Sequence, residues 1–158
     1  FLFSWEWTQM EQTASRLLRN AGSWYEHGWT YDGYTNEGEV LGASIGPGSN
    51  SHYFALNRIR DKEKIGLAFE IIDQDNDFYH EAFASASDSR RYWKDFNLHL
   101  NFSKKYKNFW LSSNLMYSRS LNYNWDLDDT ATDYYHPGND VNNFHATIKL
   151  AYLIPFAN

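Results

Sequence analysis

Large apolar residues alternate with polar residues along several stretches of the chain. This period of two is typical of β-strands whose two faces meet different surroundings. The alternation is clearest near the end, where the even positions are Phe144, Ala146, Ile148, Leu150, Tyr152 and Ile154 and the odd positions begin with Asn143, His145, Thr147 and Lys149. The same pattern predicts strands at residues 1–8, 51–59, 63–73, 92–103, 106–119 and 142–155.

Two other predicted strands also separate an apolar face from a polar face. Within 92–103 the apolar set is Phe96, Leu98, Leu100 and Phe102, and the polar set is Asn97, His99 and Asn101. Within 106–119 the apolar set is Phe109, Leu111, Leu115 and Tyr117, with Ser112 and Asn114 opposite. We therefore expect a sheet with one apolar face and one polar face.

The predicted strands are long, and their connections are uneven. They have about 8–14 residues, close to the roughly 9–11 that a tilted strand needs to cross a bilayer and longer than the usual 5–6 of soluble sheets. Tight turns at 60–62 and 103–105 alternate with long acidic connections at 73–91 and 120–141, and Tyr and Trp gather toward strand ends. This is the pattern of outer-membrane proteins. We predict an all-β, antiparallel transmembrane β-barrel; a soluble β-sandwich is the alternative.

The pattern is compatible with two strand counts. Counting back from a periplasmic C-terminus gives six membrane strands. The smallest outer-membrane barrels have about eight strands. An alternative makes 24–31 and 38–46 strands as well. We favour six strands and a long extracellular or lumenal loop at about 9–50, because the glycines between Gly33 and Gly48 would interrupt membrane strands. The chain, which starts within an alternating pattern at Phe1, is then expected to be a fragment or a processed chain, the C-terminal portion of one larger barrel domain.

Composition excludes several other classes of protein. The 158 residues carry a formal net charge of −6, no cysteine and 19% aromatic residues. The aromatic content argues against a disordered chain, and the acidic balance argues against a nucleic-acid binder. Without cysteine there is no disulfide framework and no thiolate metal site. No apolar run is long enough for a transmembrane helix.

Short motifs gather between residues 6 and 59: Glu6-Trp7-Thr8, Tyr25-x-His27, Tyr31-Asp32-Gly33-Tyr34, Gly38, Leu41-Gly42 and the stretch from Gly46 to Tyr53. In these motifs the segment resembles the capsule assembly Wzi family of outer-membrane proteins; beyond residue 59 the agreement is one of strand period. The resemblance implies a barrel of about eighteen strands in a Gram-negative outer membrane, within the range known for such barrels. It also implies loops folded over or into the lumen, and a role in holding capsular polysaccharide at the cell surface.

The best candidate for glycan binding is the aromatic part of the long loop. Flat rings pack on sugar C–H groups, while hydroxyl, indole and carboxylate groups hydrogen-bond sugar hydroxyls. The candidate residues are Trp24, Tyr25, His27, Trp29, Tyr31, Asp32 and Tyr34. The alternative is that these rings pack among themselves as the core of a loop that plugs the barrel.

Metal binding and catalysis have weak support. The run Asp73–Asp77 fails the calcium-loop template, which needs Gly where Phe78 stands and Glu where Ala84 stands, so we interpret it as a solvated acidic loop. The histidines form no ligand pair at the usual spacings. Ser51-His52 and Tyr79-His80-Glu81 are the only local candidates for catalytic groups. We expect no catalytic residue, no metal and no cofactor.

These observations predict a non-catalytic outer-membrane protein of Gram-negative cells, with loops at the cell surface. Its expected partners are capsular or other surface polysaccharide and outer-membrane lipid, not nucleic acid, and the full-length barrel is expected to be monomeric. The alternatives are a passive channel for small polar solutes and, with less support, an outer-membrane enzyme that modifies lipid.

Overall fold

Six strands form one antiparallel sheet in the computed structural model, which describes residues 1–13, 34–37, 39–83, 91–126 and 139–154. The strands of this sheet, in spatial order, are β1 (Leu2–Gln9), β4 (Asn50–Arg60), β5 (Glu63–Asp73), β6 (Lys94–Tyr106), β7 (Phe109–Leu121) and β8 (Val141–Tyr152). A separate small hairpin pairs β2 (Thr35–Asn36) with β3 (Glu39–Val40). The fold is therefore all-β, as predicted.

All six predicted strands are confirmed, and the main error lies at one turn. We predicted a turn at 103–105, but β6 continues to Tyr106 and the turn is Lys107-Asn108, with Lys107 at a φ of 51°. The strand β6 continues through Lys104 and Lys105, because lysine side chains can lie on either face at the end of a sheet. The proposed strand at 38–46 is wrong, since β3 ends at Val40 and pairs only with β2. The proposed strand at 24–31 lies outside the described residues.

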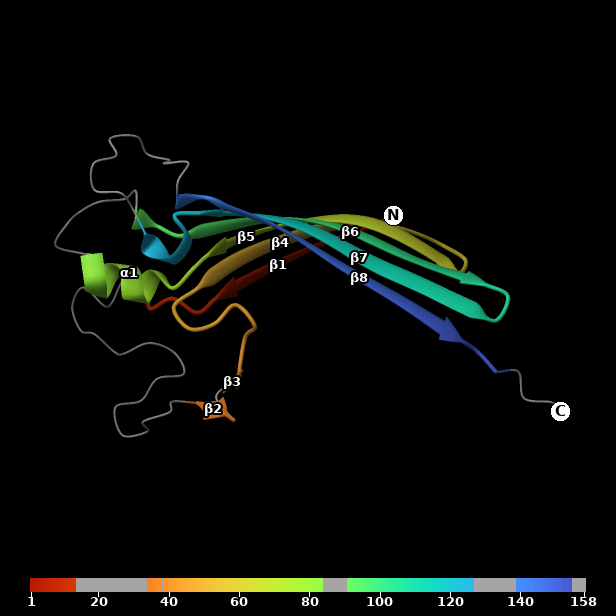
Figure 1. The fold of residues 1–158 in the computed structure, drawn as a ribbon, viewed down its shortest axis with the longest axis horizontal. Helices are drawn as coiled ribbons and strands as arrows, with labels where there is room; N and C mark the ends of the chain where they lie inside the picture. The colour runs from red at the N-terminus through yellow and green to blue at the C-terminus, as the bar shows by residue number, and fades with distance from the viewer. Residues whose placement is uncertain (14–33, 38, 84–90, 127–138, 155–158) are drawn as a thin grey trace.

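The long connections leave and rejoin the sheet at one end, which we call the loop end (Figure 1). The helix α1 (Asn76–Phe83) lies here in the connection from β5 to β6, and the 3-10 turn η4 (Tyr123–Trp125) follows β7. The hairpin β2–β3 also lies at this end. At the opposite end, which we call the turn end, two-residue turns join β4 to β5 and β6 to β7.

The strand register separates apolar and polar side chains across the whole sheet. One row of paired residues is Trp5, Phe54, Phe69, Leu98, Tyr117 and Phe144. The adjacent row, on the other face, is Glu6, Tyr53, Glu70, Asn97, Ser118 and Asn143. We call these the apolar face and the polar face. The two faces expected from the sequence are confirmed.

The polar face is the more buried of the two. Asn57 and Asn97 on this face are 7% and 6% exposed, whereas Leu67 on the apolar face is 57% exposed. The sheet is bent along its length (Figure 1), and we infer that the polar face lies inside the bend, where side chains crowd one another. Small residues fill this crowded layer, chiefly Ala55 and Ala68. Burial is thus the reverse of that in a soluble protein with an apolar core.

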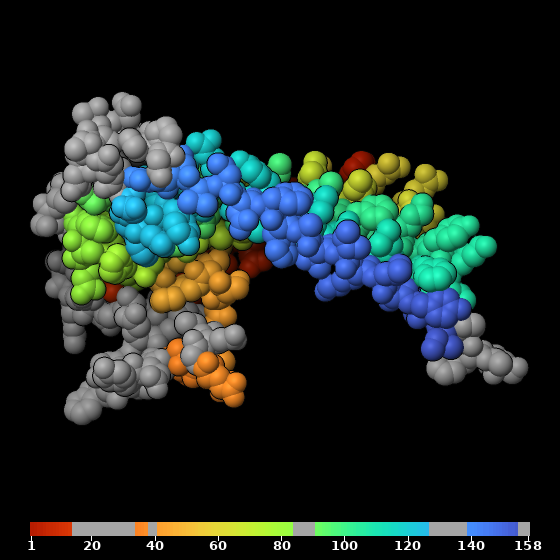
Figure 2. Space-filling model, in the orientation of Figure 1, coloured from red at the N-terminus to blue at the C-terminus, as the bar shows by residue number. Residues whose placement is uncertain are grey.

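The described strands do not close on themselves. Each of β1 and β8 pairs with one neighbour in the sheet, so both are edges. In the space-filling view the strands extend away from the loop end, and β8 lies along the near side (Figure 2). The described residues therefore show an open antiparallel sheet.

Candidate functional site

The apolar face carries large exposed side chains on every strand. They include Phe3 and Trp5 on β1, with 65% and 59% exposed, and Phe144 and Ile148 on β8, with 64% and 71% exposed. His52 also lies on this face, where its ring stacks with Trp5 and Trp7 at centroid distances of 6.5 and 6.0 Å. A contiguous apolar surface of this extent is unusual for a soluble monomer and is typical of a surface that contacts lipid or another apolar layer.

Three ion pairs involve charged side chains of the apolar face, and all three lie near its ends. Lys94 contacts Asp73 at the loop end. At the turn end the distance from Lys104 Nζ to Glu63 Oε1 is 2.5 Å. On β7, Arg119 donates to Asp140, which precedes β8, at 2.9 Å. Pairing lowers the cost of keeping a charge next to an apolar environment.

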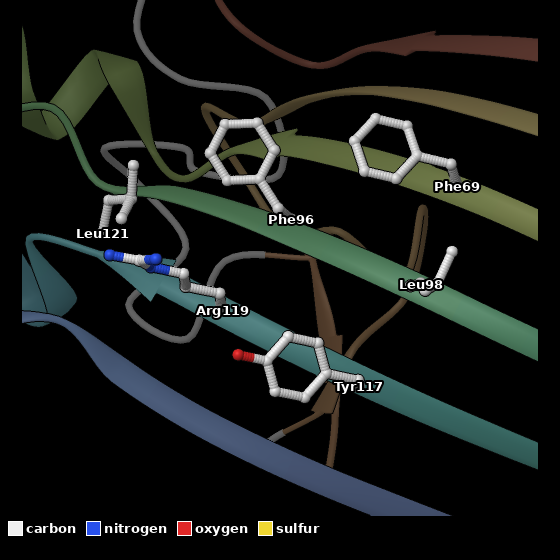
Figure 3. Close-up of a pocket in the computed structure, with 6 residues that line it drawn as sticks. All are labelled: Phe69, Phe96, Leu98, Tyr117, Arg119 and Leu121. Atoms are coloured by element: carbon white, nitrogen blue, oxygen red, sulfur yellow. The ribbon is translucent and has the colours of Figure 1, made fainter.

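A hollow of about 540 Å³ opens on the apolar face toward the loop end. Its lining residues are Phe69, Phe96, Leu98, Tyr117, Arg119 and Leu121, which come from β5, β6 and β7 (Figure 3). The wall is aromatic and aliphatic, with one guanidinium group at the side. Because Arg119 is already paired with Asp140, the hollow offers mainly apolar contact.

The polar face carries a network at the middle of the sheet. Asn97 Nδ2 donates to Glu70 Oε2 at 3.0 Å, and His99 Nε2 lies 3.7 Å from the same oxygen, too far for a hydrogen bond. The Tyr53 ring meets His99 edge to face, with centroids 6.1 Å apart. Asn97 Oδ1 and His99 Nε2 have no hydrogen-bond partner among the described residues. Both atoms are buried, and buried polar atoms usually bond protein groups or ordered water.

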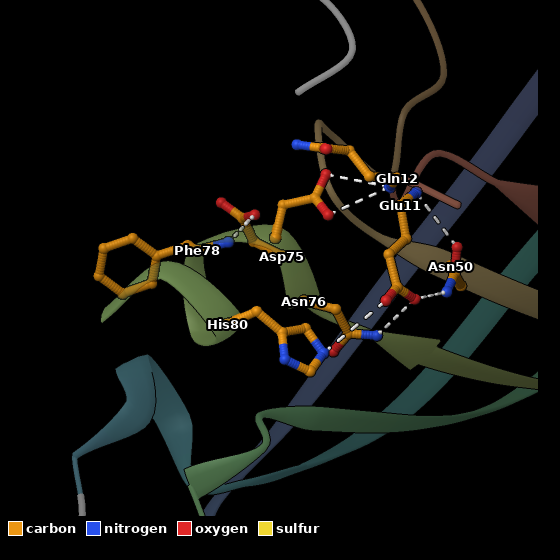
Figure 4. Close-up of polar contacts among 8 residues, drawn as sticks. Glu11, Gln12, Asn50, Asp75, Asn76, Phe78 and His80 are labelled. Atoms are coloured by element: carbon orange, nitrogen blue, oxygen red, sulfur yellow. Dashed lines mark hydrogen bonds and ion pairs between the residues drawn. The ribbon is translucent and has the colours of Figure 1, made fainter. Parts of the chain in front are cut away.

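A second polar network fixes the start of the long loop at the loop end (Figure 4). Glu11 Oε2 accepts hydrogen bonds from Asn50 Nδ2 at 2.6 Å and Asn76 Nδ2 at 3.1 Å, and Glu11 Oε1 lies 3.9 Å from His80 Nε2. The Gln12 amide N–H donates to both carboxylate oxygens of Asp77, at 3.1 and 3.2 Å. These contacts tie residues 11–12 to the first turn of α1.

The acidic run at 73–77 is therefore not the solvated loop that we expected. Asn76 and Asp77 are 7% and 6% exposed. Asp75 Oδ1 accepts from the Phe78 amide at 3.0 Å, so this carboxylate occupies the N-terminus of α1, and Asp73 pairs with Lys94. The physical reason is that the run begins a helix, whose free amide groups attract carboxylates.

Aromatic rings gather around α1 and η4 at the loop end. Tyr79 stacks on Tyr92 with centroids 3.9 Å apart, and Phe78 packs on Trp125 at 4.6 Å. Trp93 meets Trp125 edge to face at 5.1 Å. Two rings of the group, Phe78 and Tyr123, are each 43% exposed. This loop-end aromatic cluster thus combines a packed interior with rings open to a ligand.

Of the seven residues of the predicted glycan site, the structure describes Tyr34 alone. Trp24, Tyr25, His27, Trp29, Tyr31 and Asp32 lie outside the described residues. Tyr34 is described: its side chain is 64% exposed, and its carbonyl accepts a hydrogen bond from the Leu41 amide at 2.9 Å. We did not predict the exposed rings of Phe78 and Tyr123. The aromatic density of residues 78–83, 92–93 and 123–125 is the sequence signal that marks this cluster.

The local candidates for catalysis find no support in the described geometry. Ser51 and His52 are consecutive residues of β4, so their side chains point to opposite faces, and Ser51 is buried. His80 of the second candidate lies against Glu11 and the Tyr79 and Tyr92 rings. Among the described residues, no group of three or more His, Asp or Glu side chains is arranged to hold a metal ion. The described helices are too short and polar to cross a bilayer.

Comparison with known protein families, curated proteins and solved structures finds no match to this chain. The two faces of the sheet and the chemistry of the loop end are the features that bear on function.

Proposed function

We propose that the chain forms part of the wall of a Gram-negative outer-membrane β-barrel that binds capsular or other surface polysaccharide without catalysis. The observation that carries the proposal is the sidedness of the sheet. Apolar rings stand exposed on one face, and amide, hydroxyl and imidazole groups occupy the other, as lipid-facing and lumen-facing residues do in such barrels.

The dimensions of the apolar face agree with this proposal. On β7 its apolar stretch runs from Phe109, which packs against Tyr152 at 5.0 Å, to the Arg119–Asp140 ion pair. Ten residues at about 3.3 Å each span about 33 Å along the strand. A tilt of about 40° reduces this to about 25 Å, the height of the apolar band of outer-membrane barrels.

The second part of the proposal is polysaccharide binding. Its support is the resemblance of residues 6–59 to capsule assembly proteins and the exposed rings of Tyr34, Phe78 and Tyr123 at the loop end. Several weak ring–sugar and hydrogen-bonding contacts would act together along one polymer. The loop-end network around Glu11 would hold these loops in place.

The test is a capsulated host in which the gene for the full-length protein is deleted. Capsular polysaccharide is assayed in the cell pellet and in the medium. We expect the total to be unchanged and the polymer to move into the medium, and complementation with variants at Trp24, Trp29 or Tyr34 to restore less polymer to the pellet than wild type. A capsule that stays with the pellet would contradict retention.

A passive channel is the second candidate, and the polar face is the observation that favours it. Asn, Ser and His side chains line this face as they line water-filled lumens. Planar-bilayer recordings of the full-length protein separate the two functions. Steady single-channel conductance favours a channel, whereas a closed lumen together with loss of capsule on deletion favours retention. Fractionation with outer membrane and a band shift on heating before electrophoresis test the barrel itself.

A further inference from the structure

A second hollow, of about 380 Å³, lies on the polar face near the turn end, away from the loops used in the proposed function. One row of paired residues crosses it: Lys64 on β5, Ser103 on β6, Ser112 on β7 and Lys149 on β8. The next row adds Asn101, Asn114 and Thr147. We call this the lysine hollow.

The two lysines flank a floor of neutral polar groups. Their strands are separated by three inter-strand spacings, about 14 Å at the usual 4.8 Å each, with Ser103 and Ser112 between them. Asn114 Nδ2 donates to Asn101 Oδ1 at 2.7 Å. This bond uses one amide atom of each side chain. The Asn101 Nδ2 donor and the Asn114 Oδ1 acceptor remain available to a ligand.

The charges of the lysine hollow are not neutralised by the described residues. On the apolar face Lys94, Lys104 and Arg119 each pair with a carboxylate. Neither Lys64 nor Lys149 forms an ion pair with any residue that the structure describes. Two uncompensated ammonium groups beside one cavity give it a positive potential.

Carboxylates are distant from the lysine hollow along the polar face. Between the turn end and the row of His99 and His145, the described polar-face positions of the six strands contain neither Asp nor Glu. The first acidic residue on this face of β5 is Glu70, six residues from Lys64 or about 20 Å along the strand. Glu70 is already bonded to Asn97. Among the described residues, none on the polar face between the turn end and the His99 row supplies the two lysines with a negative charge.

We propose that the lysine hollow binds a sugar acid, that is, a ligand with one carboxylate and several hydroxyl groups. The lysines provide charge for the carboxylate, and the Ser, Thr and Asn groups provide donors and acceptors for hydroxyls. A volume of about 380 Å³ lies at the small end of the range for ligand pockets and suits one or two sugar residues. The site rests on the proposed function in one respect: the polar face must be open to water, as in a lumen.

The experiment measures binding to the full-length protein in detergent by isothermal titration calorimetry. The probes are glucuronate, glucose as its neutral counterpart, and inorganic phosphate as an anion without a sugar ring. We expect glucuronate to bind tightest, and Lys64→Gln with Lys149→Gln to raise its Kd about tenfold through loss of charge-assisted hydrogen bonds. The paired Lys→Arg variant should retain binding.

The control variant is Lys62→Gln with Lys107→Gln, which removes the same charge from exposed residues of the two-residue turns. It should leave the Kd for glucuronate unchanged. No binding of glucuronate, equal binding of glucose or phosphate, or an unchanged Kd in the Lys64/Lys149 variant would each overturn the site. The band shift on heating is recorded for every variant. If wild type lacks that shift, the proposed barrel fails; if the shift is kept and binding is absent, only the lysine hollow fails.

Discussion

Gly66 lies on the polar face, between the buried Asn57 on β4 and Asn101 on β6. A Cβ at this position would come within 2.2 Å of Asn57 Oδ1 and 3.0 Å of its Cγ. We expect Gly66→Ala to lower the free energy of unfolding by about 1–3 kcal/mol, because overpacking forces neighbouring groups to shift. Urea unfolding followed by tryptophan fluorescence measures the change.

The matched control for this prediction is the double variant Gly66→Ala with Asn57→Ala. Shortening Asn57 removes both of the closest atoms. The free energy of unfolding of the double variant should therefore be at least that of Asn57→Ala alone. If Gly66→Ala costs as much in the Asn57→Ala background as in wild type, the clash is not the cause of the loss.

At the residue scale, side-chain direction was predictable and partners were not. The alternation placed Asn97, His99 and Asn101 on one face and Leu98 and Leu100 on the other, as the register has them. It did not reveal that Glu11 bonds Asn76, because these residues are 65 positions apart in the chain. A contact of that kind depends on where β1 and β5 end in space, which no local pattern encodes.

At the element scale, consecutive residues of β8 test which face meets lipid. Ile148 is 71% exposed on the apolar face, and Thr147 lies on the polar face. In lipid vesicles we expect Ile148→Arg to destabilise the full-length protein by about 2–4 kcal/mol, and Thr147→Arg to have little effect. Urea unfolding in vesicles gives both values. Equal tolerance of arginine at the two positions would contradict a lipid-facing apolar face.

The docking of residues 11–12 on α1 is a second test at this scale. Removing the carboxylate in Asp77→Ala leaves the Gln12 amide N–H without the bonds it makes at 3.1 and 3.2 Å. We expect hydrogen exchange at the Gln12 amide to rise about tenfold or more, since each such bond to a charged group contributes about 1.5–3 kcal/mol. Glu81→Ala on the exposed side of α1 is the control. Unchanged exchange at Gln12 would show that Asp77 does not hold this segment.

Strand positions were largely predictable because the alternation is strong over most of each strand. The turn between β6 and β7 was misplaced because lysines occupy both candidate positions, Lys104-Lys105 and Lys107. The helix α1 was missed altogether. Its eight residues, with Asp77 in the first turn, were interpreted as part of an acidic loop, and the bonds of Asp75 to the Phe78 amide and of the Gln12 amide to Asp77 were not foreseen.

At the scale of the whole molecule, the two edge strands of the described sheet can each pair with a further strand. Among the described strands β1 pairs only with β4 and β8 only with β7, which leaves backbone N–H and C=O groups for another strand. The native chain has no cysteine, so introduced thiols report on edge pairing alone. In residues 1–158 folded into detergent, we expect Trp5→Cys with Phe144→Cys to form disulfide-linked oligomers on a non-reducing gel. Leu67→Cys, on the central strand β5, should stay largely monomeric, and monomers in both variants would contradict open edges.

The order of the connections has a consequence for how the sheet assembles. Strands β4 to β8 pair strictly with their sequence neighbours, whereas β1 reaches β4 only across residues 10–49. Contacts between neighbours in sequence form fastest, so we expect β4–β8 to fold as a unit and β1 to join late. Closure entropy grows slowly, by only about 0.6 kcal/mol for each doubling of a flexible loop. The long connection can therefore gain or lose residues at little thermodynamic cost, and the loop end can change its ligand over evolution while the rest of the sheet stays the same.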